Sequence, residues 1–556
     1  MAAFIAQNMA PIMFVSLVIF LLIGYPVAFS LAAVGLVFFV IGVELAPLSG
    51  GSISLDWPLL AAMPERIFGV MNNDTLLAIP FFTFMGLILE RSGMAEDLLD
   101  TIGQLFGPIR GGLAYAVIFV GALLAATTGV VAASVISMGL ISLPIMLRYG
   151  YDRRLASGVI AASGTLAQII PPSLVLIVMA DQLGRSVGDM YKGAFIPGLV
   201  LAGLYAGYVF LVSIIKPNMA PALPKEARTL GSGVASLLVM IVLFIAISYG
   251  VAHWLFAKYP KMPSDNAMIW SGSAAILVCY AIAWANATFN LNLLSRLASQ
   301  VIIVLVPPLA LIFLVLGTIF VGIATPTEGG AMGAAGALLL AMGKKRLTWD
   351  LMKQAMDSTA KLSAFVVFIL IGARVFSLTF YGVNGHTWVE HLLTSLPGGQ
   401  IGFLIFVNIL VFLLAFFLDF FELAFIIVPL LGPAAEKLGI DLIWFGVILG
   451  VNMQTSFMHP PFGFALFFLR SVAPKEDYKD RVTGKMMKAV TTAQIYMGAI
   501  PFVIIQVIMI ALVILIPSMV MVYKAGEVKL DQKAIEEQFK QIAPPLGSDE
   551  PPPLKF

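Results

Sequence analysis

Long apolar runs separated by short polar stretches fill this chain of 556 residues almost from end to end. A helix of roughly 17–25 apolar residues crosses a bilayer, and the chain contains many runs of that length. We predict spans near residues 11–23, 26–45, 74–91, 155–180, 194–215, 233–256, 267–287, 301–323, 326–342, 359–379, 442–470 and 497–523. The pattern therefore predicts an all-α, polytopic membrane protein.

Two further apolar segments, 113–146 and 400–433, are too long for one crossing. Polar residues interrupt each of them near its middle, at TTGVVAAS (127–134) and at LDFFE (418–422). Non-helical backbone at this depth is tolerated only where it is buried in protein or lines a watery cavity. We therefore predict that each segment forms a re-entrant helical hairpin.

Two stretches far apart in the chain resemble one another and both contain a proline pair. GVIAASGTLAQIIPPSLVLIVMA (158–180) matches GVILGVNMQTSFMHPPFGFALFF (446–468) with one residue of slippage, and the pairs are Pro171–Pro172 and Pro460–Pro461. Proline lacks the N–H that a helix interior needs, so both helices should break there. Broken helices at corresponding positions of two halves point to the binding site of a transporter.

The internal repeat extends beyond these helices. GYPVAFSLAAVG (24–35) resembles ATPTEGGAMGAAG (324–336), and residues 73–93 resemble 357–377. We therefore divide the chain into a first repeat (1–215), a linker with two extra spans (216–300), a second repeat (301–523) and a polar tail (524–556), in which a short helix precedes disorder.

Charge placement predicts that the two repeats are inverted. The loop 43–60 has no Lys or Arg, whereas its counterpart begins with GKKR at 343–346; Arg148, Arg153 and Arg154 follow the first hairpin, and only Lys437 follows the second. Short cytoplasmic loops collect Lys and Arg. We expect the amino terminus outside the cell and residues 148–154 and 343–350 in the cytoplasm.

Composition changes this picture little but excludes several classes of protein. Hydrophobic residues make up 60% of the chain and charged residues 11%, with a net charge of +2, so a nucleic-acid partner is not expected. The one cysteine, Cys279, excludes a disulfide framework, and the four histidines lack metal-ligand spacing. No enzyme motif and no nucleotide loop is present, so we expect a non-enzymatic transporter driven by an ion gradient, with no cofactor.

The first candidate half-site combines the tip of the first hairpin with the first helix break. Hydroxyl and freed carbonyl oxygens suit a sodium ion, and freed N–H groups attract anions. Alternatively, these small residues only allow tight helix packing. The candidate residues are Thr127, Thr128, Gly129, Ser163, Gly164 and Thr165.

The second candidate half-site lies before the second proline pair. Asn and Gln carbonyls can ligate a cation, and their amides can hold a carboxylate. The candidates are Asn452, Gln454, Thr455, Ser456 and His459, the last of which either caps a half-helix or couples transport to protons.

Asp419 and Glu422 are the costliest residues to bury in a membrane. They could face a cation, a proton path or an arginine such as Arg374, or the hairpin tip could simply be wet. Glu328 is interpreted as a helix cap that acts with the Thr325 and Thr327 hydroxyls, with a role in the site as the alternative.

Four runs carry a family resemblance: residues 162–198, 322–338, 416–431 and 452–474. They resemble the large membrane subunit, of the DctM type, of tripartite ATP-independent periplasmic (TRAP) transporters, and are most similar to its longer branch for 2-oxo acids, lactate, mannitol or chloroaromatics. The resemblance covers about residues 10–523. It implies a sodium symporter of the bacterial inner membrane with an elevator mechanism. The implied partners are a DctQ-like four-helix membrane subunit and a DctP-like periplasmic binding protein that delivers an organic acid anion.

By position, the resemblance implies one sodium site at Thr127, Thr128 and Ser163–Thr165, and another at the Asp419 hairpin with Asn452, Thr455, Ser456 and His459; substrate would lie between them. His459 stands where relatives usually have threonine, and residues 475–487 look like an inserted rim loop. The competing hypotheses are a stand-alone sodium- or proton-coupled anion transporter of related hairpin fold, and an intramembrane enzyme or scaffold.

Overall fold

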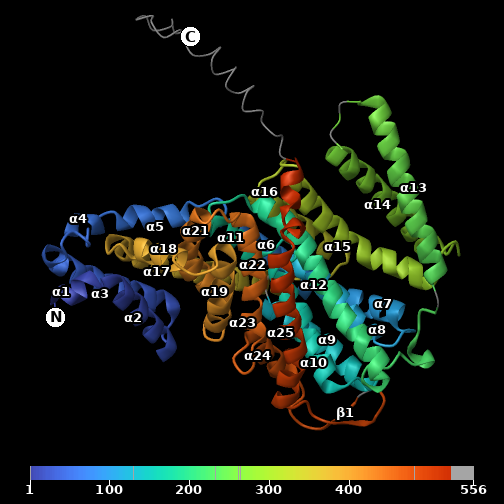
Figure 1. Ribbon diagram of the computed structural model, residues 1–556. Helices are drawn as coiled ribbons and strands as arrows, with labels where there is room; N and C mark the ends of the chain where they lie inside the picture. The colour runs from blue at the N-terminus through green and yellow to red at the C-terminus, as the bar shows by residue number, and fades with distance from the viewer. Residues whose placement is uncertain are drawn as a thin grey trace, which may run out of the picture.

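The computed structural model describes residues 2–128, 131–231, 233–260, 262, 264–480 and 482–526, and almost all of the regular structure in them is helical (Figure 1). Within these residues, eight helices are long and apolar enough to cross a membrane, or nine if the bent pair at 385–414 counts as one span. The predicted all-α, multi-pass fold is confirmed. The predicted tail helix after residue 530 lies outside the described residues.

Both halves of the chain use the same order of elements: a helix pair, two further helices, a hairpin, a broken helix and a final span. In the first half these are α2 (Met9–Ile23), α3 (Val27–Leu45), α6 (Ala78–Arg91), α7 (Met94–Phe106), α8 (Gly112–Thr128), α9 (Val131–Arg148), α10 (Arg153–Thr165), α11 (Leu174–Gln182) and α12 (Val187–Ile215), with short helices α1 (Ala2–Gln7), α4 (Trp57–Leu60) and α5 (Met63–Met71). In the second half they are α15 (Arg296–Phe320), α16 (Pro326–Gly343), α17 (Trp349–Gly382), α18 (Gly385–Thr394), α19 (Gly399–Leu414), α20 (Phe420–Glu422), α21 (Val428–Lys437), α22 (Leu442–Met453), α23 (Thr455–Met458), α24 (Phe464–Val472) and α25 (Thr492–Leu515).

The helix α17 is longer than the span predicted at 359–379. The helix begins at Trp349, ten residues earlier, after the N-cap Thr348. Its first turns carry Asp350, Lys353, Asp357 and Lys361, so the apolar pattern does not reach them. An ion pair of 2.7 Å between Lys361 and Asp357 stabilises this polar part of the helix.

In the scaffold, helices of one half of the chain pair with helices of the other half. Helix α17 packs along α3, and α16 packs along α6. A pseudo-two-fold relation predicts this reciprocal arrangement, because it carries α3 onto α16 and α17 onto α6. Helices α3 and α17 run in the same direction, since Gly372 lies against Ala28 and the Thr379 hydroxyl donates to the Gly35 carbonyl.

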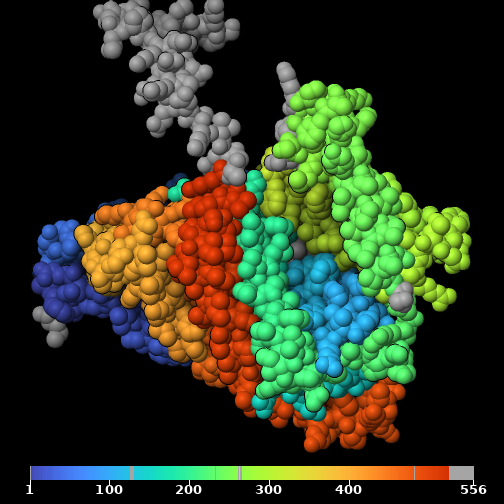
Figure 2. Space-filling model, turned by 45° about the vertical axis from the view of Figure 1, so that its right-hand side comes forward, coloured from blue at the N-terminus to red at the C-terminus, as the bar shows by residue number. Residues whose placement is uncertain are grey.

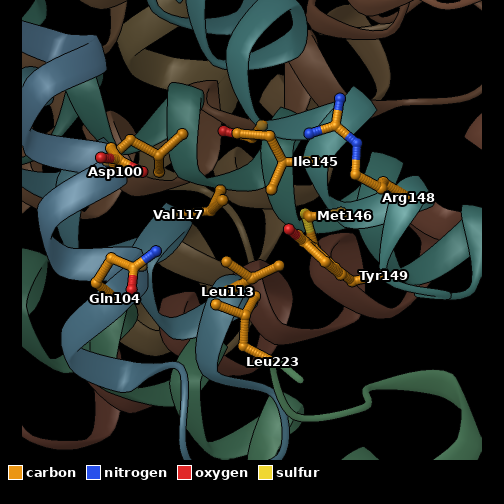
Figure 3. A pocket seen from close by; sticks show the side chains of 12 residues that line it. Asp100, Gln104, Leu113, Val117, Ile145, Met146, Arg148, Tyr149 and Leu223 are labelled. Atoms are coloured by element: carbon orange, nitrogen blue, oxygen red, sulfur yellow. The ribbon is translucent and has the colours of Figure 1, made fainter. Parts of the chain in front are cut away.

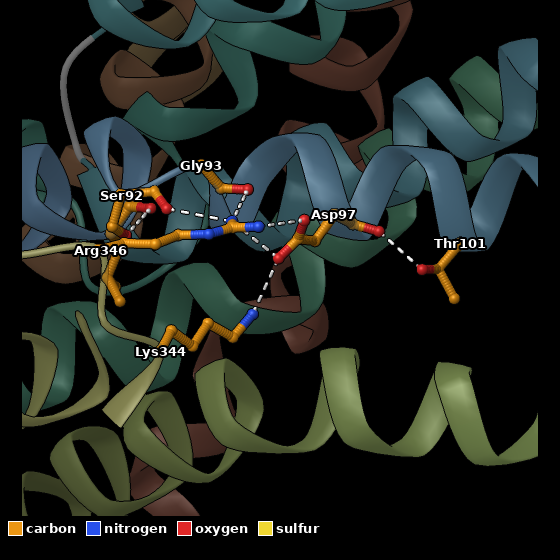
Figure 4. Close-up of polar contacts among 7 residues, drawn as sticks. Ser92, Gly93, Asp97, Thr101, Lys344 and Arg346 are labelled. Atoms are coloured by element: carbon orange, nitrogen blue, oxygen red, sulfur yellow. Dashed lines mark hydrogen bonds and ion pairs between the residues drawn. The ribbon is translucent and has the colours of Figure 1, made fainter. Parts of the chain in front are cut away.

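A charged cluster holds one end of the α6–α16 pair (Figure 4). Asp97 on α7 accepts hydrogen bonds from Lys344 at 3.0 Å and from Arg346 at 2.9 and 3.1 Å. Arg346 also donates to the carbonyl oxygens of Ser92 and Gly93, which follow the end of α6. The GKKR loop of the second half therefore closes a helix end of the first half, on the side where the sequence predicts cytoplasm.

The hairpin predicted at 113–146 is formed by α8 and α9, which pack against one another. The hairpin predicted at 400–433 is more open: α19 is followed by a short non-helical stretch, α20, one π-helical turn at Leu423–Ile427 and α21. Helix α21 packs against α18, and the π turn packs against α11 of the first broken helix. The second hairpin therefore contacts the opposite half-site rather than closing on itself.

The broken helices form the core together with the final spans. Helix α10 packs along α25, and α12 packs against α22, so each half again uses a helix of the other. The approach of α10 to α25 is very close, because a Cβ on Gly158 would lie 2.1 Å from the carbonyl oxygen of Gly498. Figure 1 shows α10, α12 and α25 side by side through the centre of the molecule.

Two elements have no counterpart in the repeat. The extra spans α13 (Val234–Lys258) and α14 (Ser264–Phe289) pair with one another and stand apart from the body, which α14 contacts through α15 (Figure 2). The segment interpreted as an inserted rim loop contains a small β-hairpin, β1 (Tyr478–Lys479) with β2 (Met486–Met487). Asp480 of this hairpin forms an ion pair of 3.0 Å with Arg148 at the end of α9.

Candidate functional site

The first predicted helix break is present, and the sequence around it explains both ends. Asp152 accepts hydrogen bonds from the N–H groups of Arg154 and Leu155 and so begins α10. The helix ends at Thr165, one 3₁₀ turn follows, and the chain passes through Pro171–Pro172, which is joined by a cis peptide bond. Ser173 then caps α11 through the N–H of Leu176, and its hydroxyl donates to the Gln168 carbonyl at 2.6 Å.

The first hairpin lies directly on this break. A Cβ on Gly121 of α8 would lie 2.5 Å from Cβ of Ser163, and one on Gly164 would lie 2.4 Å from Val135 of α9. The Ser163 and Thr165 hydroxyls are fully buried and donate to carbonyl oxygens of their own helix. A hydroxyl oxygen that donates in this way still has lone pairs for a cation. Thr127 and Thr128 are the last residues of α8, and the predicted Gly129 lies outside the described residues.

The second broken helix repeats the first in detail. Asp441 accepts hydrogen bonds from the N–H groups of Ile443 and Trp444, as Asp152 does in the first half. Helix α23 ends at Met458, and Pro460–Pro461 is again a cis bond. The aspartate cap and the proline pair are separated by the same number of residues in both halves, so the two broken helices align there without a gap. The Gly-Val-Ile runs, by which the sequences were matched, are one residue out of this alignment. In the structural register Ser163 corresponds to Asn452.

Polar residues of the second break are deeply buried. The Asn452 amide donates to the carbonyl and side-chain oxygens of Asn408 on α19, at 2.8 and 2.9 Å, while its own Oδ1 has no hydrogen-bond partner. The Gln454 amide is fully buried and unpartnered. The Thr455 and Ser456 hydroxyls donate to helix carbonyls at 2.7 Å, as the Ser163 and Thr165 hydroxyls do in the first half, although they do not occupy corresponding positions. A buried amide oxygen without a donor is a candidate cation ligand.

Asp419 and Glu422 cap one another at the tip of the second hairpin. Asp419 accepts from the Glu422 N–H and Glu422 accepts from the Asp419 N–H, both at 2.9 Å, which is a reciprocal capping box. Neither acid forms an ion pair with Arg374 in the described part of the chain. Glu328 forms the same motif with Thr325, as predicted, but the Thr327 hydroxyl instead donates to the Asp74 carbonyl.

His459 lies between aromatic rings. Its ring stacks on Phe416 and meets Phe412 edge-on, both with centroids 4.2 Å away. Its backbone N–H donates to the Thr455 carbonyl at 2.9 Å and ends α23. Both ring nitrogens are buried and have no hydrogen-bond partner among the described residues, so the imidazole caps no helix end, and the choice between capping and proton coupling stays a prediction.

A cavity of about 170 Å³ lies between the two half-sites. Gln168 and Leu174 of the first broken helix line one side, and Asp419 at the second hairpin tip lines another. Val131 at the start of α9 belongs to the first hairpin, and Phe457 belongs to the second broken helix. Both hairpins and both broken helices therefore contribute to the lining. The hairpins and breaks therefore converge on one partly open cavity, at the position where the resemblance implies substrate.

Gln168 is a polar residue of the cavity wall that the sequence analysis did not identify as a candidate site residue. Its side chain is 1% exposed, and neither its amide nitrogen nor its amide oxygen has a hydrogen-bond partner. Leaving a buried amide unpaired costs about 1–3 kcal/mol, so an unpaired amide in a cavity wall is a candidate for ligand binding. An amide only three residues before a proline pair, in an otherwise apolar run, was the available signal.

Two other cavities are lined by none of the polar candidate residues, although Pro171 borders the larger one. One, of about 110 Å³, lies between α7, α8 and the end of α9, with Asp100 and Gln104 across from Arg148 and Tyr149 (Figure 3). Arg148 is already engaged by Asp480, so its charge is largely neutralised there. The other, of about 790 Å³, is an open apolar crevice between α8, α12 and α15 whose lining includes no charged residue.

Comparisons with known proteins agree with this architecture. The model of the family "Tripartite ATP-independent periplasmic transporter, DctM component" matches residues 14–261 and 266–519. The C4-dicarboxylate TRAP transporter large permease protein DctM of Pseudomonas aeruginosa is 27% identical over 82% of this chain and 87% of its own length. The isethionate TRAP transporter permease protein DctMQ of Oleidesulfovibrio alaskensis is 25% identical over 88% of this chain and 65% of its own length.

A solved structure supports the fold alone. The Alcanivorax borkumensis YdaH transporter, described as having an unusual topology, superimposes with a TM-score of 0.50 at 13% sequence identity, over 88% of this chain and 98% of its own. The sequence matches extend to the family and do not distinguish the longer branch to which the four runs are most similar.

Proposed function

Because the chain belongs to the DctM component family of the TRAP transporters, we propose that it imports an organic acid anion together with sodium ions by an elevator mechanism. The chain is a transport protein of the bacterial inner membrane and not an enzyme. Large permeases of this family work with a periplasmic binding protein and a small membrane subunit. In the proposal, this chain receives its substrate from such a binding protein and is braced by such a subunit.

The observation that carries the proposal is the cavity between the half-sites, with the unpartnered Gln168 amide in its wall. A carboxylate that accepts hydrogen bonds from this amide would satisfy a buried donor that has no partner in the protein. Backbone N–H groups at the start of the half-helix α11 lie close by in the chain and favour an anion through the helix dipole.

The proposed sodium sites use the buried oxygens at the two breaks. Ser163 and Thr165 supply hydroxyl oxygens in the first half, and Asn452 supplies an unpartnered amide oxygen in the second. Neutral oxygen ligands in a dehydrated site suit a weakly held monovalent cation. A sodium ion at each break would offset the negative charge of the substrate between them.

The elevator step is supported by the two groups into which most contacts fall. Helices α3, α6, α16 and α17 pair with one another across the repeats, and the hairpins and breaks pack together with α12 and α25; the packing of α6 against α8 joins the two groups. Leu362 and Phe365 of α17 line the cavity, so it lies at the boundary between the two groups of helices. In the proposal, the hairpins and breaks carry the substrate past α17, which acts as a fixed wall.

The test is uptake into proteoliposomes that contain both membrane subunits, with the periplasmic binding protein added outside. The probes are labelled benzoate, pyruvate and succinate, measured with and without an inward sodium gradient. We expect Gln168→Leu to abolish uptake while leaving the melting temperature unchanged or higher, because it removes an unpaired buried amide. The matched change Gln182→Leu, at a residue that lies outside the cavity and bonds to Asp181, should leave uptake intact.

The outcomes separate the alternatives. Uptake that does not depend on sodium would show that sodium is not the coupling ion. Uptake without the binding protein would favour the stand-alone transporter. Normal sodium-driven uptake by Gln168→Leu would remove the cavity from the transport path.

A further inference from the structure

The cavity between the half-sites is unusually apolar for a protein that handles an anion. Six phenylalanine rings line it: Phe365, Phe420, Phe421, Phe457, Phe464 and Phe468. The other lining residues are aliphatic except for two, Gln168 and Asp419. We call this space the phenylalanine cavity.

The rings come from elements far apart in the chain. Phe365 belongs to α17, Phe420 and Phe421 to the second hairpin tip, and the other three to α23 and α24. Phe365 and Phe421 make an edge contact with centroids 6.1 Å apart, and Phe457 and Phe464 lie 5.7 Å apart. Both groups of helices described above therefore present aromatic surface to the same space.

A hydrophilic substrate would fit this lining poorly. Each hydroxyl or second carboxylate placed against phenyl rings loses its water without gaining a partner, at a cost of about 1–3 kcal/mol for a neutral group and more for a charge. The relatives named above carry printed substrates, C4-dicarboxylate and isethionate, that are small and strongly polar.

Size and polarity together define what would fit. An apolar cavity of roughly 150 Å³ is large enough to hold benzene, so the phenylalanine cavity, of about 170 Å³, has room for one ring or a branched chain of similar size. Gln168 offers one amide to one carboxylate, and the lining contains no cationic side chain that could hold a second. Asp419 repels each negative charge in the cavity, so a dianion is disfavoured more than a monoanion. The polar lining therefore matches a ligand with a single charged end.

We infer that the substrate is a monocarboxylate with a compact apolar body, aromatic or branched aliphatic, whose body packs among the six phenylalanines while its carboxylate binds Gln168. This inference rests on the proposed function, because it assigns the substrate class of that same site. It makes the phenylalanines the residues that determine specificity within the membrane subunit.

Ligand-induced stabilisation of the purified complex of both membrane subunits tests the inference. Melting temperature is titrated with benzoate, 4-methylpentanoate, succinate and gluconate, in sodium chloride and in choline chloride. We expect half-saturation by benzoate and 4-methylpentanoate at concentrations about tenfold or more below those of succinate and gluconate. Equal or tighter binding of succinate or gluconate, or no stabilisation by any of the four acids, overturns the inference.

A pair of neighbouring phenylalanines provides the matched variants. Phe468 lines the cavity, whereas Phe467 on the same helix is 50% exposed and is absent from the lining. Phe468→Tyr should raise the half-saturating benzoate concentration about fivefold or more, because it places a hydroxyl among the rings, and Phe467→Tyr should not change it. Equal effects of the two changes would show that benzoate binds elsewhere.

The uptake assay separates this inference from the proposed function. Sodium-driven uptake of succinate, combined with a preference for succinate in the melting assay, leaves the proposed function standing and removes the monocarboxylate. Binding of benzoate without sodium-driven uptake of any acid would support the monocarboxylate and contradict the proposed sodium-coupled import.

Discussion

The serine at the first helix break offers the sharpest test of the proposed sodium site. Ser163 and Ser157 both lie on α10, both are fully buried, and each hydroxyl donates to a carbonyl of its own helix. Only Ser163 lies at the end of the helix, where Gly121 of the first hairpin packs on its Cβ. Alanine at either position keeps the Cβ and removes one hydroxyl, so the two substitutions differ in place and not in chemistry.

The expected magnitudes follow from these contacts. Each substitution loses a hydrogen bond to a helix carbonyl, worth about 0.5–1.5 kcal/mol net, so the two should lower the free energy of unfolding by similar amounts. Ser163→Ala also loses an oxygen that would contact a cation. Interactions with a charged group are worth roughly 1.5–3 kcal/mol, which corresponds to a factor of roughly 10–150 in affinity.

The assay is the sodium dependence of uptake by proteoliposomes that contain both membrane subunits. We expect Ser163→Ala to raise the half-saturating sodium concentration by at least about tenfold and Ser157→Ala to leave it unchanged. A wild-type sodium dependence in Ser163→Ala, or an equal shift in both variants, would refute the reasoning that the break supplies a ligand.

Two further predictions concern how the hairpins and breaks are held. Gly158→Ala should destabilise the protein by about 1–3 kcal/mol, because its Cβ would lie 2.1 Å from the Gly498 carbonyl oxygen. Gly250→Ala on α13, where no atom lies within 4 Å, should be neutral or stabilising in the same thermal unfolding measurement. At the β-hairpin, hydrogen bonds from Arg148 hold the pKa of Asp480 well below its ordinary value, so the ion pair stabilises the loop above the unfolded pKa of roughly 4 and is lost only as pH falls through the folded pKa. The protection factors of backbone amides in residues 474–480 and 482–491, which correct for the intrinsic effect of pH on exchange, should therefore be equal at pH 7 and pH 5 and lower at pH 7 in Asp480→Asn. Lower protection factors at pH 5 than at pH 7 in the unchanged protein would contradict this.

Much of the fold could be predicted from local chemistry. The apolar runs predict that many helices cross the membrane, although the twelve predicted spans exceed the eight or nine helices of the described residues that are long and apolar enough to do so. A proline pair inside such a run predicts a break, because proline cannot donate the helical hydrogen bond. Both breaks are present at Pro171–Pro172 and Pro460–Pro461. The capping box at Thr325 and Glu328 is equally local, since both partners lie within one helical turn.

The predictions were less complete where a contact joins distant segments. The sequence left several partners open for Asp419 and Glu422, and the structure pairs each with the backbone of the other. Comparison of the two sequences aligned the breaks by their Gly-Val-Ile runs. The aspartate caps show that the structural alignment differs from this one by one residue. Weak similarity between apolar runs allows such a slip, because many apolar residues are interchangeable in a helix that is buried on all sides.

By itself, the sequence determined that this protein is a duplicated bundle of membrane helices with two hairpins and two breaks, since those features depend on residues adjacent in the chain. The tertiary structure alone decided that Gln168, Asp419 and Phe365 line one cavity. These residues lie in different repeats or different groups of helices, and they meet only because α17 crosses to α3 and the second hairpin reaches the first broken helix. The polarity of a cavity is a property of such converging side chains, so it emerges only when the helices are packed.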